Sequence, residues 1–84
     1  MTHKPIRYSK HAAKQASVRH ISRDSVRWML AQGIREHADT RAGEKRWRVS
    51  GKVGKRDLYV IFIERASEIE IVTVAEQQKG ADDT

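Results

Sequence analysis

Three polar side chains, His11, Gln15 and Arg19, recur at every fourth residue in the stretch SKHAAKQASVRHIS. If this stretch is helical, the three side chains form one stripe along the helix surface. A histidine near a fixed cation suits cleavage of a phosphodiester, because an imidazole with a pKa of about 6.5 can accept or donate the proton of a hydroxyl group. A guanidinium can neutralise charge that develops on phosphate oxygens. The alternative interpretation is a solvated helix face without chemistry.

A further candidate is Thr73, in the segment IVTVAEQ. It alternates with Ile69, Ile71 and Ala75 and interrupts an otherwise apolar strand face. Its hydroxyl could orient a phosphate or a proton donor if that face meets the first helix. Threonine is also common in strands of every kind, so the position by itself does not distinguish a functional role from a structural one.

The segment RAGEKRWRVSGK places basic side chains around Trp47. Arginines bind phosphates and exposed aromatic rings stack on unpaired bases, which is typical of proteins that bind single-stranded RNA. Trp47 shares its strand face with Val49 and Val53, and this favours a core position for the ring. The candidate nucleic-acid-binding residues are therefore the cations of this segment: Arg41, Lys45, Arg46, Arg48 and Lys52.

Charge is distributed unevenly along the 84 residues, whose formal net charge is +6. Residues 1–56 hold 15 Lys and Arg against 4 Asp and Glu, a balance of +11, whereas residues 57–84 hold 2 against 7, a balance of −5. A basic region of this kind favours a polyanionic partner, most simply RNA. A basic surface without a partner, or one that contacts an acidic protein, is the alternative.

Several classes of function are disfavoured by what the sequence lacks. There is no cysteine, so disulfides and thiol chemistry are excluded, and the four histidines show no metal-binding spacing. We expect neither a metal nor a cofactor. No apolar run approaches the ~20 residues of a membrane helix, and the basic first ten residues lack the apolar stretch of a signal peptide. We therefore expect a cytoplasmic protein.

The order of the periodic segments indicates an α+β fold. The Ala-rich stretch from about Ser9 to Arg19 favours a helix, Ser22 stands as an N-cap directly before a second helical pattern, and Gly33 is a natural end for that second helix. Alternating and apolar segments follow. We expect two N-terminal helices followed by a three-stranded antiparallel β-meander, over about residues 9–19, 22–33, 45–53, 56–64 and 69–75. Residues 34–37 are the candidate for a short additional strand. Residues 1–76 form one expected domain, and residues 77–84 an expected flexible polar tail.

Together these segments resemble a family of small bacterial domains of unassigned function, which is distantly similar to BrnT and to RelE/ParE-type toxins. The opening motif of that family is similar to HAxxRxxxRxI, and here His11, Ala12, Arg19 and Ile21 match it. The hairpin segment RWRVSGKVGKRDLYVIFIE and the strand IVTVAEQ continue the likeness, which covers about residues 6–76.

The resemblance implies a RelE-like fold and RNA cleavage without a metal, by the toxin of a toxin–antitoxin pair. It gives His11 the role of acid or base, Arg19 that of a phosphate clamp and Thr73 that of an orienting hydroxyl. Gln15 stands where the family commonly has arginine, and Ala75 where it commonly has an aromatic residue. The expected function is a toxin-type, RNA-directed ribonuclease with RNA and an acidic antitoxin as partners. A non-catalytic module that binds nucleic acid or protein is the alternative.

Overall fold

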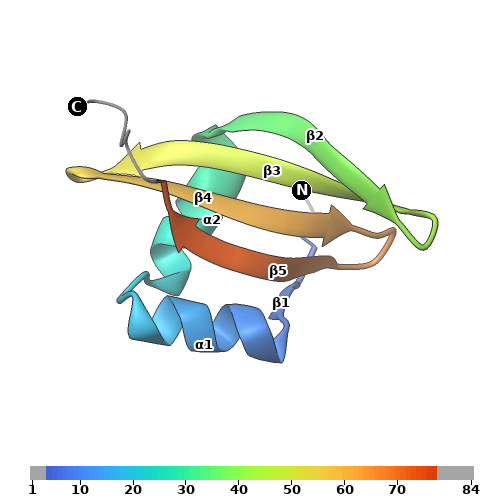
Figure 1. Ribbon diagram of the computed structural model, residues 1–84, viewed down its shortest axis with the longest axis horizontal. Coiled ribbons are helices and arrows are strands. Elements are labelled where there is room, and N and C mark those ends of the chain that lie inside the picture. Colours follow the sequence, from blue (N-terminus) through green and yellow to red (C-terminus); the bar gives the residue numbers. More distant parts are fainter. Residues whose placement is uncertain (1–3, 78–84) are drawn as a thin grey trace.

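The computed structural model describes residues 4–77, which form a five-stranded sheet and two helices (Figure 1). In chain order the elements are β1 (Ile6–Tyr8), α1 (Lys10–Val18), α2 (Arg23–Gln32), β2 (Ile34–Arg41), β3 (Glu44–Val53), β4 (Arg56–Glu64) and β5 (Ile69–Glu76). The strands lie in the order β1-β5-β4-β3-β2. β1 runs parallel to β5, and every other neighbouring pair is antiparallel.

Each helix begins at a serine that caps it. The Ser9 hydroxyl accepts the Ala12 N–H at 3.0 Å, and the Ser22 hydroxyl accepts the Ser25 N–H at 3.0 Å. A cap of this kind satisfies one of the free N–H groups at a helix start and contributes about 1 kcal/mol. The two serines therefore set where α1 and α2 begin, and the cap at Ser22 is the one that the sequence pattern predicts.

The core lies between the sheet and the helices. Val26 and Met29 of α2 are fully buried against apolar side chains of one sheet face, among them Val49, Val60 and Phe62. Burying a side chain of this size stabilises the fold by about 1.5–3 kcal/mol. In Figure 1, α2 lies behind β3 and β4, and α1 runs alongside β5. We call the opposite sheet face, toward the viewer, the open face.

The expected three-stranded meander is wrong, and with it the RelE-like architecture, because the sheet is mixed and has five strands. β2 lies at one edge, and all of its residues except Asp39 are exposed, so it lacks the apolar alternation by which strands are recognised. β1 has three residues and pairs with a strand more than sixty residues later in the chain. The pairing Ile6↔Ile69 leaves no local signal in the sequence.

Two further expectations concern the ends and the surroundings of the chain. Of the expected polar tail at residues 77–84, Gln77 donates its backbone N–H to the Asp57 carbonyl at 2.7 Å. The rest of that segment lies outside the described residues. Among the described residues, neither helix has the length and apolar character needed to cross a membrane.

Candidate functional site

The polar stripe of α1 is held against the outer edge of β5. β1 pairs with β5 only as far as Ile71, and beyond that point α1 takes its place. The Ser9 hydroxyl donates to the Val72 carbonyl at 3.5 Å, and the Val74 N–H donates to Gln15 Oε1 at 2.9 Å. Gln15 thus satisfies an amide that an edge strand would leave unpaired, and it fixes α1 along the strand.

The stripe lines a shallow surface pocket of about 360 Å³, formed by His11, Lys14, Gln15, Val18 and Arg19. His11, Lys14 and Arg19 are exposed and open to a ligand. Lys14 was not among the predicted site residues, although its position three residues after His11 places the two side chains next to one another on a helix. That spacing was the signal that could have identified it.

Helix geometry limits what the stripe can contact at once. Arg19 follows the last residue of α1 and lies eight residues after His11, so their backbones are about 12 Å apart along the helix axis. Lys14, one helical turn from His11, is the nearest cation of the stripe for a phosphate at His11, and Arg19 lies a further turn away.

Thr73 lies next to the residue that Gln15 binds. It pairs with Ile61 of β4, whereas Val74 pairs with the fully buried Val60. Because side chains alternate along a strand, Thr73 faces the open side of the sheet. The structure therefore brings the α1 stripe alongside the β5 segment that carries Thr73, although Thr73 is half-buried and does not line the α1 pocket.

The predicted basic residues do not all share one surface. Alternation along β3 places Arg46, Arg48 and Lys52 on the open face, opposite the core-facing Val49. Lys45 belongs to the other face, by the same alternation. Arg41 lies at the end of β2 and pairs with a carboxylate two residues away, Asp39, at 3.1 Å.

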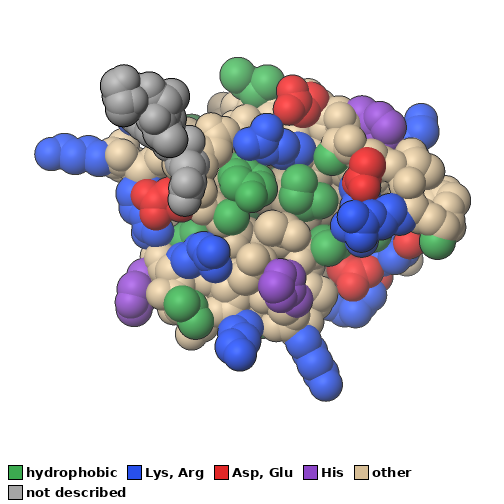
Figure 2. Space-filling model, in the orientation of Figure 1, with side chains coloured by type: hydrophobic (Ala, Val, Ile, Leu, Met, Phe, Trp, Pro, Cys, Tyr) green, Lys and Arg blue, Asp and Glu red, His purple; other side chains and the backbone are tan. Residues whose placement is uncertain are grey.

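The open face has an apolar middle with cations around it. Figure 2 shows hydrophobic side chains at the centre of this face and Lys and Arg side chains surrounding them. The register assigns Tyr59 and Ile61 of β4 and Ala75 of β5 to this side. The Arg48 guanidinium stacks over the Tyr59 ring, 4.5 Å from its centroid. The same guanidinium lies 3.5 Å from the Glu36 carboxylate. Trp47, the aromatic residue of the basic segment, packs instead against the core.

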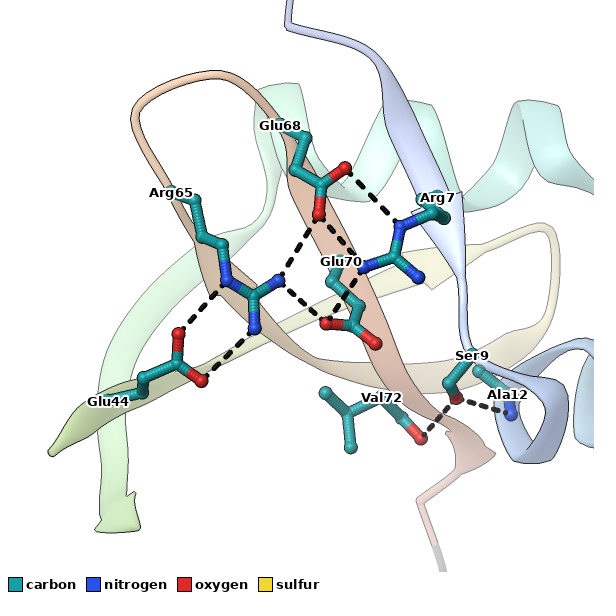
Figure 3. A network of polar contacts seen from close by, with 8 residues as sticks. All are labelled: Arg7, Ser9, Ala12, Glu44, Arg65, Glu68, Glu70 and Val72. Carbon is teal, nitrogen blue, oxygen red and sulfur yellow. Dashed lines mark hydrogen bonds and ion pairs between the residues drawn. The ribbon is translucent and has the colours of Figure 1, made fainter. Parts of the chain in front are cut away.

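A charged network closes one end of the open face (Figure 3). Arg65 is bound to Glu44 at 3.0 Å and to Glu70 at 2.7 Å, and Arg7 donates to Glu68 at 2.9 Å. The bond from Arg7 holds the pKa of the Glu68 carboxyl below its ordinary value, while the bonds from Glu44 and then Glu70 raise the pKa of Arg65. These opposite charges compensate one another, which indicates a structural role.

Some cations on the open face and on α1 lack such compensation. Within residues 4–77, no carboxylate pairs with Arg46, Lys52, Lys14 or Arg19. In the same range no group of three His, Asp or Glu residues could hold a metal ion. Among the described residues, α1 and β3 therefore each carry cations that no carboxylate neutralises by an ion pair.

Comparison with known proteins identifies the family of this chain. No curated protein and no solved structure matches the chain. A family model, described as a domain of unknown function, DUF4258, matches residues 8–76. The match includes the α1 stripe, β3 with its cations and the strand that carries Thr73. The chain therefore belongs to the DUF4258 family.

Proposed function

We propose that the protein binds single-stranded RNA on the open face of its sheet. The observation that carries the proposal is the set of cations on β3 and α1 that pair with no carboxylate among the described residues, together with the Arg48–Tyr59 stack between β3 and β4. β3 and β5 are two strand spacings apart, about 10 Å, and α1 lies beyond the outer edge of β5, so a single-stranded segment that reaches both sets of cations spans more than this distance. Cations would hold its phosphates and the Arg48–Tyr59 stack would receive a base.

The test compares two double variants that each remove two positive charges. One pair lies on the open face of β3 and the other pair does not lie on that face of β3. Binding of a fluorescently labelled single-stranded RNA is measured by anisotropy at several salt concentrations. Arg46→Ala with Lys52→Ala should weaken binding and reduce the slope of log affinity against log salt by about 2, one for each phosphate that is no longer neutralised. Lys45→Ala with Lys55→Ala removes the same charge from the core-side register of β3 and from the turn between β3 and β4, and it should change the slope far less.

Two results would contradict this proposal. Equal decreases in affinity in both double variants would mean that net charge, and not the open face, determines binding. Tighter binding to single-stranded DNA of the same sequence would assign the face to DNA. In either case the fold and the family membership would be unaffected.

Metal-independent RNA cleavage by the α1 stripe is the second candidate function. The observation that favours it is the shared pocket of His11 and Lys14 beside the strand that carries Thr73. His11 would transfer the proton, Lys14 and Arg19 would bind adjacent phosphates, and Thr73 would orient the backbone of the RNA. The α1 motif resembles that of a small bacterial domain family with a distant similarity to BrnT and RelE/ParE-type toxins, and on this resemblance we extend the proposal to a toxin neutralised by an acidic antitoxin.

Cleavage of a labelled RNA in the presence of EDTA tests this second candidate. His11→Ala should abolish cleavage while RNA affinity stays within about twofold, because the lysines and arginines provide most of the phosphate binding. His20→Asn is the matched control: His20 has φ +55°, which asparagine tolerates, and it lies outside the pocket. Equal cleavage by all three proteins would remove His11 from the mechanism. Binding without cleavage by the wild type would leave a binding module.

A further inference from the structure

A second surface feature lies on the other side of the sheet, between β1 and α2. It is an open, mainly apolar groove of about 720 Å³, lined by Lys4, Pro5, Ile6, Arg27, Leu30, Ala31 and Ile69. Ile6 and Ile69 pair across β1 and β5 and form one wall, and Leu30 and Ala31 of α2 form the other. None of the residues assigned to RNA binding lines it.

The groove exists because α2 packs over β3 and β4 and leaves the β1 end of the sheet uncovered. Ile6, Leu30 and Ile69 are only partly buried, so apolar surface remains in contact with water. β1 is also an edge strand, with β5 as its neighbour in the described sheet. An apolar surface of this kind, with cations at its border, marks an interaction site.

Charge at the border of the groove selects the occupant. Lys4 lies at one side and Arg27 at the other. The nearest carboxylate to Arg27 is Asp24, at 3.6 Å, and both side chains are largely exposed, so this ion pair is weak and can be exchanged. Lys4 is already bound to Glu64 at 2.9 Å, which makes Arg27 the principal anchor for an incoming anion. A second copy of this chain is disfavoured, because its net charge of +6 would meet the same positive charge.

We infer that this groove binds an acidic amphipathic helix of a partner protein, whose apolar side chains fill the groove and whose carboxylates meet Arg27. Helices dock in this way by placing residues i, i+3, i+4 and i+7 into an apolar groove. The inference goes beyond RNA binding, since groove and open face are separate surfaces. By this inference, an acidic protein partner binds at the groove between β1 and α2.

The test uses a synthetic peptide with leucine at helical positions i, i+3, i+4 and i+7 and glutamate elsewhere, titrated into isotopically labelled protein. The amide resonances of Ile6, Leu30 and Ile69 should shift in a saturable manner. A peptide of the same composition with its leucines distributed around the helix should bind at least about tenfold more weakly, because it cannot place them in one groove. A lysine version should not bind.

Two variants locate the contact. Ala31→Glu places a carboxylate in the groove and should weaken peptide binding by about tenfold or more, because the charge is desolvated and repels the peptide. Gln32→Glu makes the same change in charge one residue further along α2, outside the groove, and should have little effect. RNA anisotropy of both variants should equal that of the wild type, so failure of the groove and failure of the open face are distinguishable.

Four outcomes would overturn the inference. One is the absence of saturable shifts at Ile6, Leu30 and Ile69. Another is shifts confined to the cations of β3, which would show that the acidic peptide binds the open face by charge alone. The third is equal binding to Ala31→Glu and Gln32→Glu. The fourth is concentration-dependent dimerisation that broadens the groove resonances without peptide, which would assign the groove to a second copy of the chain.

Discussion

Gln15 is the residue whose role changes most between sequence and structure. In the sequence it is a gap in a cationic stripe, whereas in the structure its side-chain oxygen accepts the Val74 N–H at 2.9 Å. An arginine at this position has no acceptor to offer. This role could not be predicted from spacing, because Val74 is 59 residues away in the chain. What spacing does predict is the exposed face itself, with His11 and Arg19 on it.

We expect Gln15→Ala to lower the free energy of unfolding by about 1 kcal/mol, the net value of one hydrogen bond to a partly buried amide. Chemical denaturation measures the decrease, and hydrogen exchange at the Val74 amide should become faster. Lys14→Ala changes the neighbouring exposed side chain and should leave both measurements close to those of the wild type. An unchanged Val74 exchange rate in Gln15→Ala would show that this bond does not fix α1 to β5.

Among the helices and strands, those with signals in neighbouring residues were predictable from the sequence, and those defined by distant pairing were not. The start of α2 was predictable because Ser22 and Asp24 are adjacent in the chain to the turn that they stabilise. β4 was predictable from its continuous apolar run. Only the first half of β2, residues 34–37, was a candidate strand, and β1 was not predicted, because its partner β5 lies more than sixty residues later in the chain. An exposed edge strand requires no apolar pattern of its own.

The junction between α2 and β2 depends on Gly33. A Cβ atom at this position would lie 2.6 Å from the Ser50 carbonyl oxygen and 2.7 Å from that of Met29. Both are backbone atoms, so neither can move aside at low cost. We expect Gly33→Ala to destabilise the protein by about 2–3 kcal/mol through overpacking, measured as a shift of the denaturation midpoint.

Gly43 is the matched control for that prediction. It has φ +79°, and a Cβ atom there would meet no neighbour within 4 Å. Gly43→Ala should therefore cost about 1 kcal/mol, from backbone conformation alone. If the two substitutions destabilise equally, close packing at the α2–β2 junction is not what requires glycine at position 33.

For the molecule as a whole, the charge asymmetry of the sequence is partly cancelled by folding. Acidic residues of β4, β5 and the connection between them meet basic residues that come earlier in the chain, as in Lys4–Glu64, Arg7–Glu68 and Arg56–Glu76. The remaining positive charge is the part that a ligand can use. Summed charge indicated a polyanionic partner, but composition could not predict which cations are neutralised, because that depends on the order of strands in the sheet.

Arg65 links two strands that are not neighbours in the sheet, since it binds Glu44 at the start of β3 and Glu70 in β5. Arg65→Met should lower the thermal unfolding midpoint at pH 7 by leaving these carboxylates without their shared cation, although exposure to solvent moderates the decrease. Arg41→Met is the control, because Arg41 pairs only with a local carboxylate two residues away.

The effect of Arg65→Met should also depend on pH in a defined direction. Arg7, followed by Arg65, holds the pKa of Glu68 below its ordinary value of 4.5, so the folded state binds the proton of this carboxyl more weakly than the unfolded state does. The stabilisation is therefore present above about pH 4.5 and is lost as the pH falls through the lower folded pKa. The difference in unfolding midpoint between wild type and Arg65→Met should shrink over that interval by the smaller part of this stabilisation that Arg65 provides, since Arg7 provides the larger part. A difference that stays constant from pH 7 down to about pH 3 would mean that Arg65 acts by packing rather than by charge.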